Sequence, residues 1–345
     1  MGEHAVVYGR PAIAAAIDLR VTVRVSEAPG GGVVLDLPRL PHSEETSWKA
    51  LRTYARTARE SWEAYSREPG PELFRVVRGT DPAHLVKAAL GEAAEALGEE
   101  DPPGLRLRVD SALPVGSGFG SSAATATGVI AAYLAVRGEA LDLERIGRIA
   151  LEAERRQHGL PSGIDGATVL HGGLLWARKT GGELITERIA ARSPLLSRLR
   201  VYDTGTPAEP TGAVVAAVRH ARDRDPARHE KLLDRIETAT LGFRTELEED
   251  SESPERVREL IRECQSCLEE LGTVPAEVRG LVRRIEAEGG AAKISGAGSL
   301  SGPGAGSLLV YDPAPERISG WSFLRPFPFH SVHLGAPGLR QETDA

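Results

Sequence analysis

The chain has 345 residues, of which 41% are hydrophobic and 26% charged, and its formal net charge is −7. This length favours two domains, and this composition is typical of a globular protein rather than a disordered one. The acidic balance argues against a nucleic-acid partner, which draws its affinity from clustered Lys and Arg. No apolar run approaches the roughly 20 residues that span a bilayer. We therefore expect a cytoplasmic protein that binds neither nucleic acid nor membrane.

The first hundred residues predict sheet followed by helix. Apolar or alternating residues predict strands over residues 5–8, 12–25 and 33–37. Helical spacing of apolar residues then predicts helices over residues 48–65 and 82–97. Sheet structure therefore comes first in the chain.

The middle of the chain predicts a strand, a glycine-rich loop and a helix in that order. Leu105, Leu107 and Val109 alternate with polar residues and lead directly into Pro114, and a helix is expected from Ser121. A second helix over residues 143–157, a loop and a strand ending near Trp176 follow. Residues 181–196 then read as a connection between domains.

The C-terminal half mixes several helices with a few strands, which is an α+β pattern. Strands are expected over residues 201–204 and 291–295, and helices over residues 213–221, 229–247, 257–271 and 275–288. Cys264 and Cys267 lie on one of these helices with no histidine or second cysteine pair nearby, so we expect reduced thiols rather than a metal site. We place the domain boundary between residues 185 and 186.

The glycine-rich segment from Pro114 to Ala124 is the first candidate for chemistry. Its glycines let backbone amides approach an anion, and the helix that follows adds positive partial charge at its N-terminus. The lysine of a Walker loop is absent. A capped helix with Ser121 as N-cap remains the alternative explanation.

Two carboxylates eleven residues apart are the second candidate. Glu154 follows Ile146 and Ala150 at one-turn spacing on an apolar stripe, so it should point inward. A buried carboxylate needs a cation or an arginine partner. Asp165 lies in a loop rich in proline and glycine that would hold it in a defined geometry, although an aspartate in a turn often only caps it.

Three motifs together resemble the GHMP kinases, and most of all their mevalonate kinase branch. They are the opening segment Gly2 to Ile17, the pattern Pro-x-x-x-Gly-x-Gly-Ser-Ser-Ala over residues 114–123, and Lys293-Ile-Ser-Gly-Ala-Gly298. Glu154 and the Pro-Ser-Gly-Ile-Asp run over residues 161–165 match the same branch in sequence and spacing. The resemblance implies a two-domain α+β fold, with an N-terminal domain like domain 2 of ribosomal protein S5 and a ferredoxin-like C-terminal domain.

The resemblance also implies an ATP- and Mg²⁺-dependent phosphorylation of mevalonate, with a role for each matching residue. Asp165 is the catalytic base, and Ser122 and Glu154 are the magnesium ligands. The expected ATP-binding residues are Pro114, Gly116, Ser117, Gly118, Gly120, Ser121, Ser122 and Ala123. The expected substrate-binding residues are Glu3, His4, Ser162, Gly163, Gly296 and Ala297.

The sequence departs from this branch at three places. The family carries a lysine upstream of its Glu-His pair, and this chain begins after that position, so we expect a truncated start. Residues 166–171 differ from the usual run beside the substrate, and residues 299–304 replace a glycine run, which predicts a longer or stiffer third loop. These departures leave open another GHMP kinase acting on phosphomevalonate, a sugar or homoserine, or a ligand sensor without catalysis. A homodimer is also left open.

Overall fold

The computed structural model describes residues 1–100, 102–114, 118–251 and 253–342, and the chain forms two compact units that interleave along the sequence. Unit 1 contains Met1–Asp18, Pro114–Phe119 and Gly172–Pro337, and unit 2 contains Leu19–Leu113, Gly120–His171 and Gly338–Ala345. The first residues belong with the later ones because strand β1 (Ala12–Ala15) pairs with β6 (Leu174–Thr180). These units therefore do not follow the single boundary expected at residue 185.

Unit 2 is built on a four-stranded sheet whose strands lie in the order β2 (Val21–Glu27), β5 (Leu105–Ser111), β3 (Gly32–Leu37) and β4 (His42–Ser47). The β3–β5 pair is parallel and the other two pairs are antiparallel. Leu105, Leu107 and Val109 are buried, and the residues between them are exposed. The alternation predicted for this strand is confirmed.

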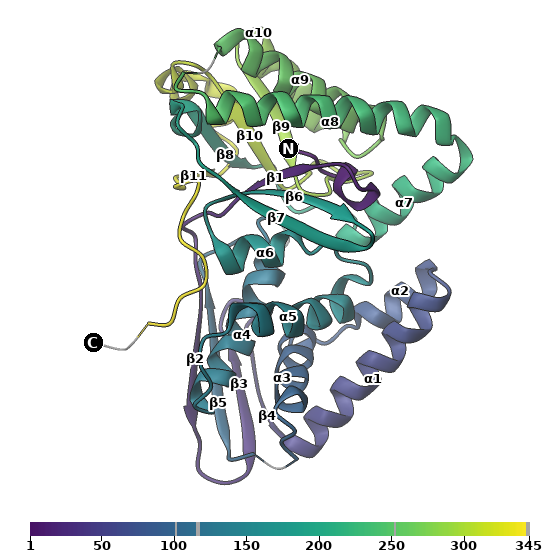
Figure 1. The fold of residues 1–345 in the computed structure, drawn as a ribbon, viewed down its shortest axis with the longest axis vertical. Coiled ribbons are helices and arrows are strands. Elements are labelled where there is room, and N and C mark those ends of the chain that lie inside the picture. Colours follow the sequence, from purple (N-terminus) through teal and green to yellow (C-terminus); the bar gives the residue numbers. More distant parts are fainter. Residues whose placement is uncertain (101, 115–117, 252, 343–345) are drawn as a thin grey trace. The chain divides into compact units, whose positions relative to one another are not determined.

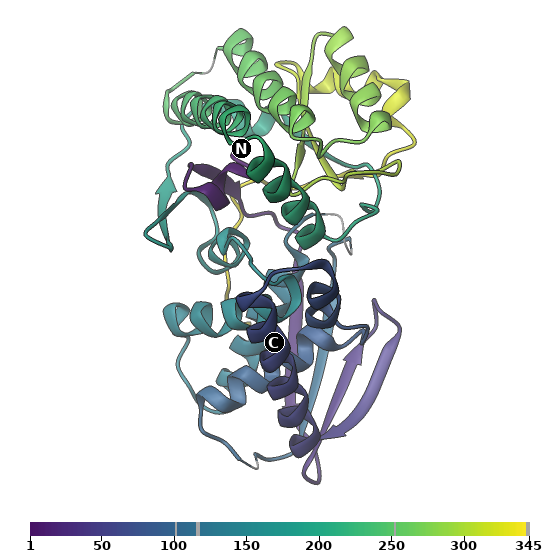
Figure 2. The ribbon, with the colours of Figure 1, turned by 90° about the vertical axis from the view of Figure 1, so that its right-hand side faces the viewer.

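Helices cover one face of this sheet (Figures 1 and 2). The helices of this unit are α1 (Trp48–Arg67), α2 (Pro71–Arg78), α3 (His84–Ala96), α4 (Ser121–Val136), α5 (Leu143–His158) and α6 (Ile164–His171). Of these, α1 and α4 contact the strands, whereas α2 packs on α1 and α5, and α6 packs on α4 and α5. Helix α4 lies against β2, where a Cβ on Gly128 would come within 2.8 Å of Val23 Cγ2. The absence of a side chain at Gly128 therefore sets how closely α4 approaches the sheet.

Unit 1 contains two further sheets and four long helices. β7 (Glu183–Ile189) completes a three-stranded sheet in the order β1-β6-β7. The second sheet has the order β11 (Phe329–His330), β8 (Leu199–Asp203), β10 (Ser307–Tyr311) and β9 (Ala291–Ser295). The helices are α7 (Thr211–Arg224), α8 (Pro226–Glu248), α9 (Pro254–Glu270) and α10 (Ala276–Ala287). Cys264 and Cys267 are buried in α9 as free thiols, as predicted.

Two local predictions are wrong. Ala5–Tyr8 forms a 3₁₀ helix instead of a strand, because His4 and Gly9 on either side have positive φ angles of 60° and 78° and turn the chain. Residues 181–196 are not a plain connection between domains. Gly181 and Gly182 form a turn, and β7 pairs back onto β6 along its full length.

Among the described residues, no helix is long and apolar enough to cross a membrane.

The close approach at Gly128 predicts opposite effects for two glycine-to-alanine changes in helices. Gly128→Ala should lower the free energy of unfolding by roughly 1–3 kcal/mol, because the new methyl group overpacks against Val23. Gly280→Ala in α10 meets nothing within 4 Å, so it should raise that free energy by roughly 0.5–1 kcal/mol through helix propensity. Urea unfolding of both variants measures the effects. Equal shifts in the same direction would contradict the packing argument.

Candidate active site

Three helices of unit 2 carry the three side chains that the sequence analysis placed around a metal-bound phosphate. Ser122 lies in the first turn of α4, Glu154 in the last turns of α5 and Asp165 in the first turn of α6. A Cβ on Gly120, the N-cap of α4, would lie 3.8 Å from Asp165 Cβ. A Cβ on Gly166 would lie 3.3 Å from Glu154 Oε2. The starts of α4 and α6 and the end of α5 therefore meet within unit 2.

Glu154 is a buried carboxylate without a compensating partner. It is 4% exposed, and among the described residues its side chain makes no hydrogen bond or ion pair. Burial, and secondarily the negative charge of Asp165, raise the pKa of Glu154 to about 8. The carboxyl group is thus largely protonated near neutral pH unless a cation approaches it. The inward direction predicted from the spacing is confirmed.

Asp165 differs from its prediction in local structure. It was expected within a loop, but the loop ends at Gly163, whose φ is 84°, and α6 begins one residue before Asp165. The Ser162 hydroxyl oxygen accepts a hydrogen bond from the Ile164 amide at 3.3 Å and so caps the turn. The Asp165 side chain remains exposed. Desolvation by the surrounding protein raises the pKa of Asp165. Because the residue is exposed to solvent, this effect is limited.

The start of α4 is built to leave amides free. Its N-cap is Gly120 with φ 71°, so no side chain caps the helix there, and the amides of Ser122 and Ala123 lack the partner that a capping side chain would supply. Ala123 is buried, so only its backbone could contact a ligand. Gly116 and Ser117 lie outside the described residues, and Pro114 and Gly118 belong to unit 1.

The third motif packs against the glycine-rich loop inside unit 1. A Cβ on Gly296 would lie 3.6 Å from Gly118 Cα, and a Cβ on Gly118 would lie 3.2 Å from the Ser295 carbonyl oxygen. Both glycines have positive φ angles, 98° and 75°. A side chain at Gly118 would crowd the Ser295 carbonyl oxygen, and at both positions the positive φ angle disfavours any residue other than glycine. The described part of the glycine-rich loop and the third motif therefore form one backbone surface.

His4 ties the start of the chain to the same third motif. It is 6% exposed, and its Nε2 lies 2.9 Å from the Ala297 carbonyl oxygen. A carbonyl oxygen only accepts, so Nε2 carries the proton and Nδ1 of the neutral ring is left as an acceptor. Burial lowers the pKa of His4, which favours this neutral form. His4 thereby fixes the position of Ala297.

Glu3 is held by a buried lysine. Lys293 Nζ, on β9, lies 2.5 Å from Glu3 Oε1 and 2.6 Å from the Ile294 carbonyl oxygen. Burial opposes the ionisation of Glu3, but the Lys293 ammonium, the Met1 ammonium and the hydrogen bond from Lys293 together outweigh it and hold the pKa of Glu3 at about 2. The exposed fractions of the two side chains are 12% for Glu3 and 1% for Lys293. Glu3 is therefore an ionised residue that shapes the segment around it.

Glu209 is a site-supporting residue that the sequence analysis missed. Its carboxylate accepts hydrogen bonds from the Ser299 hydroxyl at 2.6 Å, the Leu300 amide at 2.9 Å and the Ser301 hydroxyl at 2.5 Å. Burial opposes its ionisation, but these donors prevail and lower the pKa of Glu209. Ser299 and Ser301, which lie where the family carries a glycine run, are thus hydrogen-bonded to the segment after β8. These three hydrogen bonds give a physical reason for the stiffer third loop, which stays a prediction.

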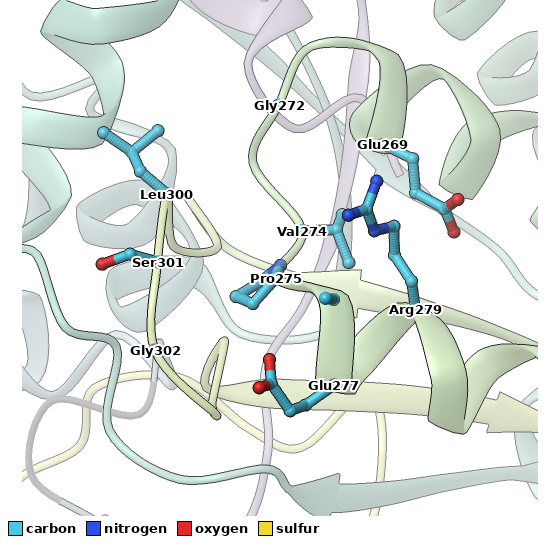
Figure 3. Close-up of a pocket in the computed structure, with 10 residues that line it drawn as sticks. Glu269, Gly272, Val274, Pro275, Glu277, Arg279, Leu300, Ser301 and Gly302 are labelled. Carbon is cyan, nitrogen blue, oxygen red and sulfur yellow. The ribbon is translucent and has the colours of Figure 1, made fainter.

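A cavity of about 440 Å³ lies beside this clamped loop in unit 1 (Figure 3). Leu300, Ser301 and Gly302 line one side of it, and Pro275, Glu277 and Arg279 at the start of α10 line the other. None of the residues predicted for the site lines it. This cavity therefore adds no support to the predicted site residues.

The donor set of unit 2 suits magnesium better than zinc. Among the described residues, no group of three or more His, Cys, Asp and Glu side chains could hold a metal ion. Magnesium characteristically takes one or two carboxylates together with substrate phosphates and water. Glu154, buried without a partner, and the Ser122 hydroxyl fit that pattern.

Comparisons with known proteins give a consistent result. A family model described as GHMP kinases N terminal domain matches residues 84–173. The mevalonate kinase of Archaeoglobus fulgidus is 31% identical over 86% of this chain and 85% of its own length. The human mevalonate kinase is 31% identical over 98% of this chain and 91% of its own length.

Solved structures share the fold at lower sequence identity. The structure of L. major mevalonate kinase in complex with R-mevalonate has a TM-score of 0.68 and 22% identity, covering 92% of this chain and 86% of its own. The Lactococcus lactis galactokinase complexed with galactose has a TM-score of 0.72 and 16% identity, covering 98% and 91%. The two-domain α+β fold predicted from the sequence is confirmed.

The raised pKa of Glu154 predicts a pH-dependent gain in stability for Glu154→Gln in the absence of metal. A group whose pKa is higher in the folded state binds more protons there, so its contribution to stability falls as pH rises from about 4.5 to about 8. The variant should therefore match the wild type at pH 5 and exceed it by roughly 1–4 kcal/mol at pH 8.5. Calorimetry in EDTA measures this. Glu144→Gln, an exposed change on the same helix, should show no such difference, and a gap independent of pH would contradict the assignment.

The buried ion pair predicts a large cost for removing only its lysine. Lys293→Met should lower the free energy of unfolding by up to roughly 3–5 kcal/mol, because the buried Glu3 carboxylate loses its nearest cation and keeps only the Met1 ammonium, 3.5 Å from Oε1. Adding Glu3→Gln should recover part of this loss. Lys231→Met, at an exposed position on α8, is the matched control and should have little effect. Denaturant unfolding compares Lys293→Met, Glu3→Gln, the double variant and Lys231→Met, and additive losses in the double variant would refute the coupling.

Proposed function

The chain belongs to the GHMP kinase family, and we propose that it transfers the terminal phosphoryl group of ATP to the primary hydroxyl of mevalonate, which gives 5-phosphomevalonate and ADP. The observation that carries this proposal is the buried, unpartnered Glu154 beside Asp165 at the start of α4. The likeness to mevalonate kinases over nearly the whole chain supports the choice of acceptor.

Backbone amides hold the ATP phosphates in this proposal. The first turn of α4, with Gly120, Ser121, Ser122 and Ala123, presents N–H groups at the positive end of the helix. Pro114, Gly116, Ser117 and Gly118 supply the preceding loop. Gly296, in the third motif, lies against Gly118, and Ala297 follows it. Phosphoryl transfer depends mainly on such positioning and on charge stabilisation.

Ser122 and Glu154 would hold the magnesium ion that accompanies ATP. When bound, the ion neutralises charge on the phosphates. Glu154 gives up its proton when it binds a cation, so nucleotide binding with the metal should release protons near neutral pH. The high pKa of the free carboxyl group supports this role.

Asp165 would orient the acceptor hydroxyl and take its proton. It is exposed at the start of α6 and has no hydrogen-bond partner among the described residues, so its carboxylate is available to a substrate. Ser162 and Gly163 shape the turn before it and would border the acceptor. Glu3 and His4 contribute from unit 1 by fixing the third motif through Lys293 and Ala297. The cytoplasmic location and a homodimer stay predictions from the sequence.

The assignment of Asp165 predicts a large loss of rate on its removal. Protein incubated with ATP, magnesium and mevalonate should release ADP, and Asp165→Asn should lower kcat by at least about two orders of magnitude, because the acceptor proton loses its base. Asp250→Asn, an exposed change in unit 1, is the control and should leave turnover unchanged. A coupled ADP assay gives both numbers. Unchanged turnover in Asp165→Asn would sink the base assignment.

The acceptor needs a separate test, because a galactokinase shares this fold as closely as a mevalonate kinase does. Wild-type protein should be offered mevalonate, phosphomevalonate, homoserine and galactose in parallel. The proposal expects the highest kcat/KM for mevalonate. A different preferred acceptor would place the chain elsewhere among the GHMP kinases, and nucleotide binding without transfer to any acceptor would indicate a sensor.

A further inference from the structure

A histidine that the proposed mechanism does not use contacts one of its central residues. Ser122 Oγ lies 2.7 Å from His158 Nε2. His158 is the last residue of α5, four positions after Glu154, so the imidazole and the carboxylate lie one turn apart on the same face of the helix. Helix α5 therefore presents both groups towards the starts of α4 and α6.

The end of α5 is held firmly enough for this contact to be specific. Gly159 follows with φ 74°, and its carbonyl oxygen accepts a hydrogen bond from Trp62 Nε1 at 2.7 Å. A Cβ on Gly159 would lie 2.5 Å from the Tyr65 ring. Two residues earlier than His158, the Arg156 carbonyl oxygen lies 2.9 Å from His84 Nε2. Helices α1 and α3 thus fix the backbone that carries the imidazole.

The hydroxyl of Ser122 can make only a limited number of hydrogen bonds and ligand contacts. A serine has one proton to donate and two lone pairs that accept. In the first turn of α4 this hydroxyl does not act as the helix cap, because Gly120 occupies that position. A neutral imidazole has one nitrogen that donates and one nitrogen lone pair that accepts. A serine that donates its proton to that lone pair keeps its oxygen lone pairs for a cation.

We propose that His158 is a positioning residue that accepts the Ser122 hydroxyl proton and so aims the oxygen lone pairs of Ser122 at the divalent cation that accompanies the nucleotide. This inference rests on the proposed function and extends it to a residue outside the three motifs. In the opposite arrangement, with the ring donating, the serine proton would be left for a phosphate oxygen instead. In the first arrangement, removal of the histidine should weaken binding of the cation. In the second arrangement, it should weaken binding of the phosphate.

Binding measurements with a non-hydrolysable ATP analogue separate these arrangements. Titration calorimetry should follow the analogue with magnesium and with EDTA, in the wild type, His158→Ala, His158→Gln and Ser122→Ala. We expect His158→Ala to weaken binding of the magnesium complex about tenfold, as removal of a residue that orients a metal ligand typically does. Metal-free binding should change less than about twofold, since the amides of α4 are untouched. His158→Gln should recover most of the loss, because its amide oxygen can accept the serine proton.

Kinetics give a second readout. His158→Ala should raise the magnesium concentration needed for half-maximal rate and leave the KM for the acceptor unchanged, which a general loss of structure would not do. The double variant Ser122→Ala/His158→Ala should bind the magnesium complex no more weakly than Ser122→Ala alone, because the histidine acts only through the serine. His42→Gln, a half-buried histidine of the same unit that pairs with Glu44, is the matched control and should behave as the wild type.

Each outcome decides the proposal. Equal losses of magnesium-bound and metal-free nucleotide, or additive losses in the double variant, would overturn it. The calorimetric arms do not depend on the acceptor. A wild type that binds the magnesium complex but does not phosphorylate mevalonate would reject the proposed function and still test His158.

Discussion

The burial of one carboxylate beside another is the constraint on which the site depends. Glu154 is 4% exposed and has no partner among the described residues, while Asp165 adds a second negative charge nearby. Such a pair opposes folding unless protons or a cation compensate it. The chain retains it where α4, α5 and α6 meet, with small residues, Gly120 and Gly166, keeping the space between them open. A charge arrangement that is unfavourable for stability alone is what a phosphate-bound cation requires.

Two acidic residues of unit 1 are held as ions instead. Glu3 is ionised against Lys293, and Glu209 is surrounded by three donors from the third loop. Both carboxylates have lowered pKa values, in spite of the burial that opposes ionisation, because donors or a cation surround them. They hold backbone in place and have no spare capacity for a ligand. The pKa is lowered for Glu3 and Glu209, which hold backbone in place, and raised for Glu154, the proposed magnesium ligand.

The sequence predicted what depends on short-range pattern and missed what depends on contacts between distant segments. The four-residue spacing of Ile146, Ala150 and Glu154 was enough to place a carboxylate inside. The 3₁₀ turn after His4 was missed, because the apolar run Ala5–Tyr8 looks like a strand unless the positive φ angle of His4 is known. His158 and Glu209 were missed for a different reason. Their partners lie 36 and about 90 residues away, and no periodicity links them.

The third loop shows how a chain can lose a glycine run and keep a close backbone approach. Gly298 and Gly302 both have positive φ angles beside tight contacts, since a Cβ would lie 2.1 Å from the Thr273 carbonyl oxygen at Gly298 and 3.1 Å from Ala208 Cβ at Gly302. Ser299 and Ser301 follow, and their hydroxyl groups both donate to Glu209. A run of glycines leaves such a loop free to sample many conformations, at an entropic cost when it orders. Here the ordering is already present in the folded chain, because Glu209 fixes the loop while His4 fixes Ala297 just before it. The departure from the family pattern at residues 299–304 therefore changes how the loop is stabilised and leaves its contact with Gly118 intact.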